Sequence, residues 1–167
     1  EKKNIIAGLK KIPSCLVSDI YLALGFSSYN SIDLNGAYNS YKFDLNFDIK
    51  TKYKFEEQYD LVVSNGTGEH VFNQSTLFKN IHNLTKKGGL MLNILPFLNW
   101  INHGFYNYQP IFFGDLAAAN NYEIIKMSFA NREGDEWYLK NKEHYNNLYE
   151  QIKPSNLNSE FAKQLTD

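Results

Sequence analysis

Two short apolar segments separated by an amphipathic stretch most constrain the fold of this chain. Residues 59–64 (YDLVVS) are apolar and rich in β-branched side chains, a pattern typical of a buried strand. A turn at residues 65–68 comes next, and then apolar residues recur at the spacing of one helix face: Leu77, Phe78, Ile81 and Leu84. Gly88-Gly89 is expected to close this helix, and residues 90–95 (LMLNIL) predict the next strand. Strands that alternate with helices indicate an α/β domain with a mostly parallel sheet.

The segments before this unit predict two helices and two further strands. Residues 4–12 are expected to form a short helix that Pro13 ends. Ser18 or Asp19 is expected to cap a second helix, which runs through Leu24 to a stop at Gly25. Residues 28–34 and 41–45 are strand-like.

The segments after this unit predict helices and one more strand. A helix is expected from Pro110 to a stop at Asn120-Asn121, followed by a strand over residues 122–129. No antiparallel strand is evident after Phe129, and helices are expected near residues 138–152 and 159–165. Without repeats or low-complexity linkers, residues 1–167 are predicted to form one domain, with a C-terminal helical segment over 136–167.

Charge and cysteine content exclude several classes of protein. There are 17 basic and 18 acidic residues, so no basic surplus exists for a nucleic-acid partner. The longest apolar runs are far too short to cross a bilayer, so no membrane partner is expected. Cys15 is the only cysteine, which rules out an internal disulfide and favours a cytoplasmic location.

Polar residues follow several of the predicted strands, at the edge where α/β sheets bind ligands. Asp33 can accept two hydrogen bonds from a ribose diol. The alternative is a β-hairpin, because Asn35-Gly36 is a strong hairpin signal. Asp44 can accept from an adenine amino group, or it is a solvated loop aspartate.

The turn after residue 64 is the most unusual stretch of the chain (NGTGEH, residues 65–70). Its two glycines allow the backbone to approach a ligand closely, but the spacing fits no phosphate-binding fingerprint. Glu69 and His70 are adjacent, so on a helix they point in different directions; Glu69 is expected to favour a helix N-terminus. None of the four histidines forms an HxxxH pair, and no metal site is predicted.

His103 lies in a loop after the predicted strand at residues 90–95 (NHGFYNY, residues 102–108). That loop is expected to border the same cleft as Asn65, where a histidine can act as a general base. The alternative is an aromatic loop that packs on the surface.

Five motifs in a fixed order resemble a known family. They are residues 31–33 (SID), 43–46 (FDLN), 59–63 (YDLVV), 69–71 (EHV) and 84–90 (LTKKGGL). Their order and spacing resemble a class I S-adenosylmethionine-dependent methyltransferase over about residues 18–130. The resemblance implies a Rossmann-like, mostly parallel sheet flanked by helices, with S-adenosylmethionine as cofactor and a small-molecule or glycan-type acceptor.

The resemblance also implies roles for the matched residues. Asp33 would hold the ribose hydroxyls with Leu34 against the adenine ring, and Asp44 would meet the adenine amino group with Leu45 beside it. Asn65 and Gly66 would line the methionine end of the cofactor. The residues bordering the acceptor would be Glu69, His70, His103 and Tyr106. Where the acceptor must lose a proton, our own hypothesis is that His103 acts as the base and Tyr106 orients it.

One element of the family has no match in this sequence. Nothing before Gly25 resembles the first strand and its glycine-rich loop, and the chain begins at Glu1, which suggests a partial domain. Two other functions stay open. Asp33 would suit the ribose of NAD in a dinucleotide-binding oxidoreductase equally well, and a methyltransferase-like module without activity would bind no adenosine ligand.

Overall fold

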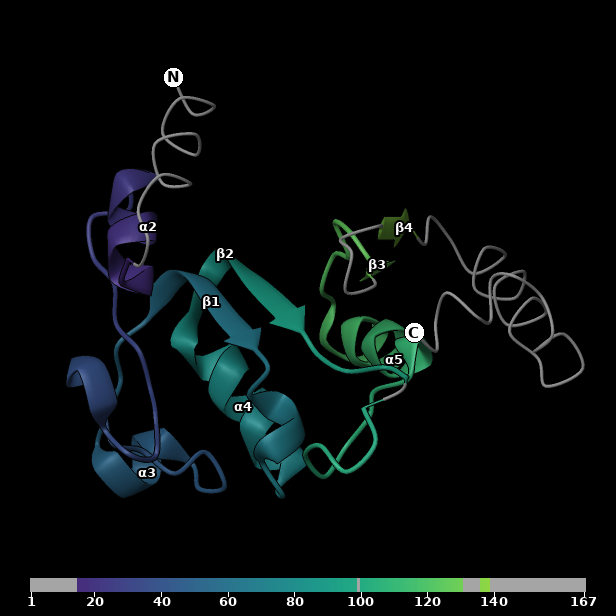
Figure 1. Ribbon diagram of the computed structural model, residues 1–167, viewed down its shortest axis with the longest axis horizontal. Coiled ribbons are helices and arrows are strands. Elements are labelled where there is room, and N and C mark those ends of the chain that lie inside the picture. The colour runs from purple at the N-terminus through teal and green to yellow at the C-terminus, as the bar shows by residue number, and fades with distance from the viewer. Residues whose placement is uncertain (1–14, 99, 131–135, 139–167) are drawn as a thin grey trace, which may run out of the picture.

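The computed structural model describes residues 15–98, 100–130 and 136–138 (Figure 1). The α-helices in this part are α2 (Val17–Ala23), α3 (Ile49–Tyr53), α4 (Gln74–Leu84) and α5 (Pro110–Asn120). Short 3-10 helices lie at η1 (Ala37–Asn39) and η2 (Gly68–His70). The strands are β1 (Tyr59–Asn65), β2 (Thr85–Ile94), β3 (Ser128–Ala130) and β4 (Glu136–Tyr138).

The centre of the fold is a parallel pair of strands joined through a helix. β1 pairs with β2 in parallel, from Leu61 opposite Leu90 to Asn65 opposite Ile94. α4 connects the two strands and packs beside them (Figure 1). The buried residues of this core are Val71, Leu77 and Ile81, against which Val62 and Met91 of the sheet pack. The chain is therefore mixed α/β with a small parallel sheet, which confirms the expected class at that level.

The face of the sheet opposite α4 is more exposed to solvent than the face that α4 covers. Side chains alternate between the two faces of a strand, so Leu90, Leu92 and Ile94 point away from Met91 and the core. These three side chains remain 49%, 45% and 51% exposed. The predicted strand at residues 59–64 is therefore present, but it is most buried on the face that α4 covers, where Ser64 is buried.

The end of α4 corrects one sequence-based expectation. Gly88-Gly89 does not close the helix: α4 ends at Leu84, and the hydroxyl of Thr85 donates to the carbonyl of Ile81 at 2.7 Å. β2 already begins at Thr85, and its register is irregular between Tyr59 and Leu61 of β1. Gly88 has φ +78°, and a Cβ on Gly89 would lie 2.9 Å from the Lys86 carbonyl oxygen. The two glycines thus allow the backbone to form a bulge near the start of β2.

The strand-like segments at 28–34 and 41–45 meet at a single parallel bridge, Ile32 with Tyr41. The Tyr41 amide donates to the Ser31 carbonyl at 2.8 Å, and the Asp33 amide donates to the Tyr41 carbonyl at 3.1 Å. Because the bridge is parallel, the hairpin alternative at Asn35-Gly36 is wrong. The Asp33 carboxylate accepts from the Asn35 amide at 2.9 Å, and this local turn competes with a longer strand ladder.

Helix predictions on either side of the central unit are confirmed where the structure describes them. α2 ends before Gly25, which has φ +98°. The expected cap at Ser18 or Asp19 is wrong: the N-cap is Leu16, and Asp19 lies in the first turn, where its carboxylate accepts from the Leu16 amide. α5 begins at Pro110, and its C-cap Asn121 has the left-handed φ of +56°.

The segment after α5 differs from the prediction. The strand expected over 122–129 is confined to β3, which pairs antiparallel with β4. An antiparallel strand after Phe129 therefore exists, and Tyr138 belongs to it rather than to a helix. The helices expected at 4–12 and 159–165, most of that at 138–152, and most of the segment 136–167 lie outside the described residues.

None of the helices in the described part of the chain is long and apolar enough to cross a membrane.

Candidate functional site

The turn after β1 is fastened to the end of β2. The amide of Gly66 donates to the Ile94 carbonyl at 3.0 Å, and Gly66 has φ +62°. The Thr67 hydroxyl donates to the Asn65 carbonyl at 3.4 Å. The left-handed backbone conformation at this position favours glycine, which is the residue found there.

Glu69 is buried, and it does not lie at the N-terminus of the helix that follows the turn. It lies in η2, a single 3-10 turn, separate from α4, whose N-cap is Asn73. The residue is only 2% exposed. The one-turn helix directs the carboxylate inward, so Glu69 does not simply border an acceptor from the surface.

The loop after β2 packs directly on Glu69. The Phe105 amide donates to the Glu69 carbonyl at 2.6 Å. Gly104 has φ +65°, and a Cβ there would lie 2.8 Å from both Cγ and the carbonyl oxygen of Glu69. The close approach requires glycine at this position. It also brings His103, the preceding residue, beside the turn.

Glu69, His70 and His103 form one cluster. Oε1 of Glu69 lies 3.4 Å from Nε2 of His103 and 3.8 Å from Nε2 of His70. The two imidazole rings are 4.7 Å apart at an interplanar angle of 76°. The histidine side chains are 49% (His70) and 39% (His103) exposed, whereas the carboxylate is buried. The cluster therefore joins one buried acid to two imidazoles that solvent or a ligand can reach.

Tyrosines fasten the same loop to the start of α4. The Tyr106 hydroxyl donates to the Phe72 carbonyl at 2.8 Å, and the Tyr108 hydroxyl donates to Oε1 of Gln74 at 2.7 Å. Burial of the phenol raises the pKa of Tyr108 to about 12. Both hydroxyls therefore hold the loop in position, and the Tyr106 hydroxyl donates to Phe72 rather than to His103.

The predicted adenosine-binding residues lie on the bridged segments. Asp33 and Leu34 are exposed, with Leu34 66% accessible. Asp44 is half-buried and accepts from the amide and the side chain of Asn46, both at 2.9 Å. These hydrogen bonds, the backbone one foremost, lower the pKa of Asp44. Leu45 packs against the core cluster.

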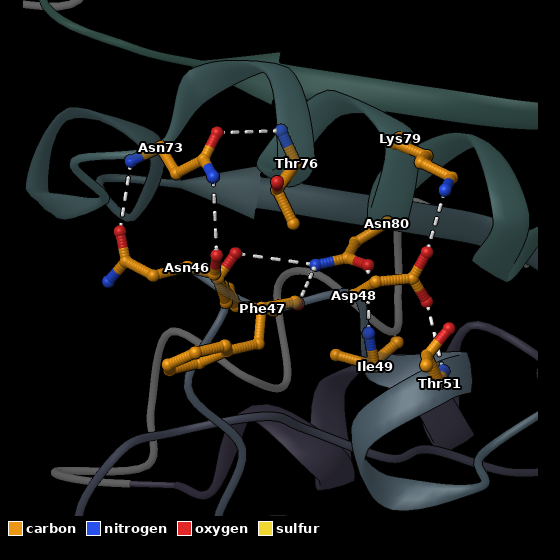
Figure 2. A network of polar contacts seen from close by, with 10 residues as sticks. Asn46, Phe47, Asp48, Ile49, Thr51, Asn73, Thr76, Lys79 and Asn80 are labelled. Atoms are coloured by element: carbon orange, nitrogen blue, oxygen red, sulfur yellow. Dashed lines mark hydrogen bonds and ion pairs between the residues drawn. The ribbon is translucent and has the colours of Figure 1, made fainter.

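A polar network ties the segment after Asp44 to α4 (Figure 2). Asn80 is fully buried; its Nδ2 donates to the carbonyls of Phe47 at 2.9 Å and Leu45 at 3.3 Å, and its Oδ1 accepts from the Ile49 amide at 3.1 Å. The Asn73 amide donates to the Asn46 side chain at 2.9 Å.

This network brings residues 45–49 next to α4 and to its N-cap Asn73, which is three residues after His70. Sequence reasoning did not single out Asn80. The available signal was a polar residue between Phe78 and Ile81, within the apolar stripe of the helix.

No family model matches the chain, and no curated protein or solved structure is detectably similar to it.

Proposed function

We propose that this chain belongs to an S-adenosylmethionine-dependent methyltransferase that acts on an oxygen or nitrogen of a small-molecule or glycan-type acceptor. One observation carries the proposal. The turn after β1 and the loop after β2 meet at the carboxyl edge of a parallel strand pair, where Glu69 contacts His103 and the Phe105 amide. In α/β sheets this edge is the usual ligand site. The family that the sequence resembles uses it for the cofactor's methionine end and the acceptor.

The residues proposed for the adenosine half have suitable chemistry and access. Asp33 is exposed and uses Oδ1 for the Asn35 amide, so its carboxylate retains accepting capacity for ribose hydroxyls. The exposed Leu34 offers an apolar surface to a purine ring. The lowered pKa of Asp44 favours the charged form that would accept from an adenine amino group.

The proposed acceptor half relies on His103 as the base. Because Oε1 of Glu69 faces Nε2 of His103, the carboxylate favours the tautomer with the proton on Nε2 and leaves the Nδ1 lone pair free. The acceptor's lone pair forms the new bond to the methyl carbon while the electrons of the sulfur–methyl bond return to sulfur. The acceptor proton passes to Nδ1. Catalysis of such a displacement depends mainly on positioning.

Calorimetric titration of the chain with S-adenosylmethionine and, in parallel, with NAD tests the proposal. We expect binding of S-adenosylmethionine, and a loss of at least about 10-fold in affinity for Asp33→Ala, because hydrogen bonds to a charged group are worth about 1.5–3 kcal/mol. Asp60→Ala is the matched control, since Asp60 is an exposed acid of β1 paired with Lys86 at 2.9 Å. It should bind like the parent.

Three results would count against the proposal. Binding of NAD alone would favour the dinucleotide-binding oxidoreductase. Binding of neither ligand would favour a module without activity. Equal losses in Asp33→Ala and Asp60→Ala would remove Asp33 from the cofactor site.

A further inference from the structure

We propose that Glu69, His70 and His103 bind a divalent transition-metal ion of the Zn²⁺ class. This inference rests on the geometry of three side chains and is independent of the proposed methyl transfer. One ligand atom from each residue falls within 4.8 Å of the other two. Sequence spacing did not reveal the group, because two ligands come from the turn after β1 and the third comes from the loop after β2.

The distances fit a shared ion. Two bonds of about 2.0–2.1 Å that meet at a tetrahedral angle place their ligand atoms roughly 3.3 Å apart. Oε1 of Glu69 is 3.4 Å from Nε2 of His103 and 3.8 Å from Nε2 of His70. The first distance matches and the second is longer, and all three ligand atoms lie within 4.8 Å of one another. To share the ion, the His70 side chain, which is 49% exposed, moves toward the other two ligands.

The buried carboxylate supplies a second, independent observation. Glu69 is 2% exposed, and its Oε2 is buried without a hydrogen-bond partner in the described part of the chain. A buried carboxylate is costly unless a cation or hydrogen-bond donors compensate for it. A divalent ion bound at this carboxylate would provide that compensation.

The donor set selects the class of ion. Two imidazole nitrogens suit Zn²⁺ and its transition-metal neighbours, whereas Mg²⁺ and Ca²⁺ prefer oxygen ligands. Three protein ligands leave a fourth position open, as in catalytic zinc sites. Since both imidazoles are partly exposed, that position is accessible from solvent.

Metal binding would change the role of His103 but not the proposed reaction. With the ion on Nε2, Glu69 no longer sets the tautomer that frees Nδ1. An acceptor hydroxyl in the open position would lose its proton more readily, because a bound Zn²⁺ lowers the pKa of its oxygen ligands. In the loaded protein the ion thus takes over the task proposed for His103.

Titration with Zn²⁺ alone, followed by calorimetry in the absence of any cofactor, tests the site. All variants carry Cys15→Ser, which removes the exposed thiol as a competing ligand. We expect His70→Ala and His103→Ala each to weaken binding at least about 10-fold, the lower bound for loss of a supporting group at a metal site. The control is the double variant His82→Ala/His144→Ala, which removes the other two histidines.

Co²⁺ absorption and circular dichroism complete the experiment. Four-coordinate Co²⁺ gives an intense visible band, expected in the parent and the control and absent from Glu69→Gln. Circular dichroism confirms that each variant is folded; if an alanine variant is not, His70→Gln and His103→Gln replace it. Equal Zn²⁺ affinity in all folded variants, or a loss confined to the control, would overturn the site. Because neither measurement uses S-adenosylmethionine, failure here is separate from failure of the proposed function.

Discussion

Replacing Asn80 by alanine tests how the segment carrying Asp44 and Leu45 is held against α4. Asn80 is 0% exposed and makes hydrogen bonds to three backbone groups, those of Leu45, Phe47 and Ile49 (Figure 2). These bonds span more than 30 residues of sequence. The substitution removes all of them and leaves the methyl group of alanine in their place.

The expected loss of stability follows from the number and burial of these bonds. Three bonds at about 1 kcal/mol each give about 3 kcal/mol. Ile49 is 1% exposed, so its amide is left buried without a partner, which adds about 1–2 kcal/mol. We therefore expect Asn80→Ala to lower the free energy of unfolding by roughly 4–5 kcal/mol. Whole domains have only about 5–15 kcal/mol, so the effect is large.

Urea denaturation followed by circular dichroism measures this loss. Asn83→Ala is the matched control on the same helix, because Asn83 accepts from Gln58 through its backbone carbonyl, which alanine retains. We expect the control to change stability by less than about 0.5 kcal/mol. A loss below about 1 kcal/mol for Asn80→Ala, or equal losses in the two variants, would refute the assigned role of Asn80.

Two further predictions concern pH and the loop after β2. The folded-state pKa of Asp44 lies below its ordinary value of 3.8 because of hydrogen bonds from Asn46, so its contribution to stability is present above pH 3.8 and is lost as the pH falls through the lowered pKa. The melting-temperature difference between the parent and Asp44→Asn should therefore be present at pH 6 and shrink toward pH 3; a difference that grows on acidification would contradict the sign. Gly104→Ala should destabilise by at least about 1–2 kcal/mol, since the new Cβ meets Glu69 at a left-handed φ. Gly25→Ala, left-handed but with open space around the added Cβ, should cost less in the same urea assay, and the reverse order would contradict the packing argument.

Local sequence signals predicted the central unit well. The apolar run at residues 59–64, the helical spacing of Leu77, Ile81 and Leu84, and the second apolar run correspond to β1, α4 and β2. Such periodicity reflects which face of each element is buried, so the element can be predicted without knowing which residues pack against it. The helix from Pro110 was predictable for the same reason, because proline and asparagine mark its two ends.

Signals that depend on distant partners misled the prediction. Gly88-Gly89 resembled a helix stop, but α4 ends earlier, where the Thr85 hydroxyl donates to the Ile81 carbonyl. A Cβ on Gly89 would crowd the carbonyl oxygens of Lys86, in its own strand, and of Asp60 on β1. Asn35-Gly36 resembled a hairpin turn, whereas the bridge between Ile32 and Tyr41 is parallel. In both cases the paired segments, β1 with β2 and Ile32 with Tyr41, decided the geometry that the glycine signals left open.

By itself the sequence determined the mixed α/β class, the succession β1–α4–β2 and the glycine-rich turn that follows β1, since these depend on local periodicity and on backbone freedom. Only the tertiary structure decided that Glu69 points inward and that His70 and His103, 33 residues apart in the sequence, meet at its carboxylate. The strand order predicts that both loops reach the same edge of the sheet, but the contact itself depends on the close approach of Gly104 to Glu69, which no pattern within either segment encodes.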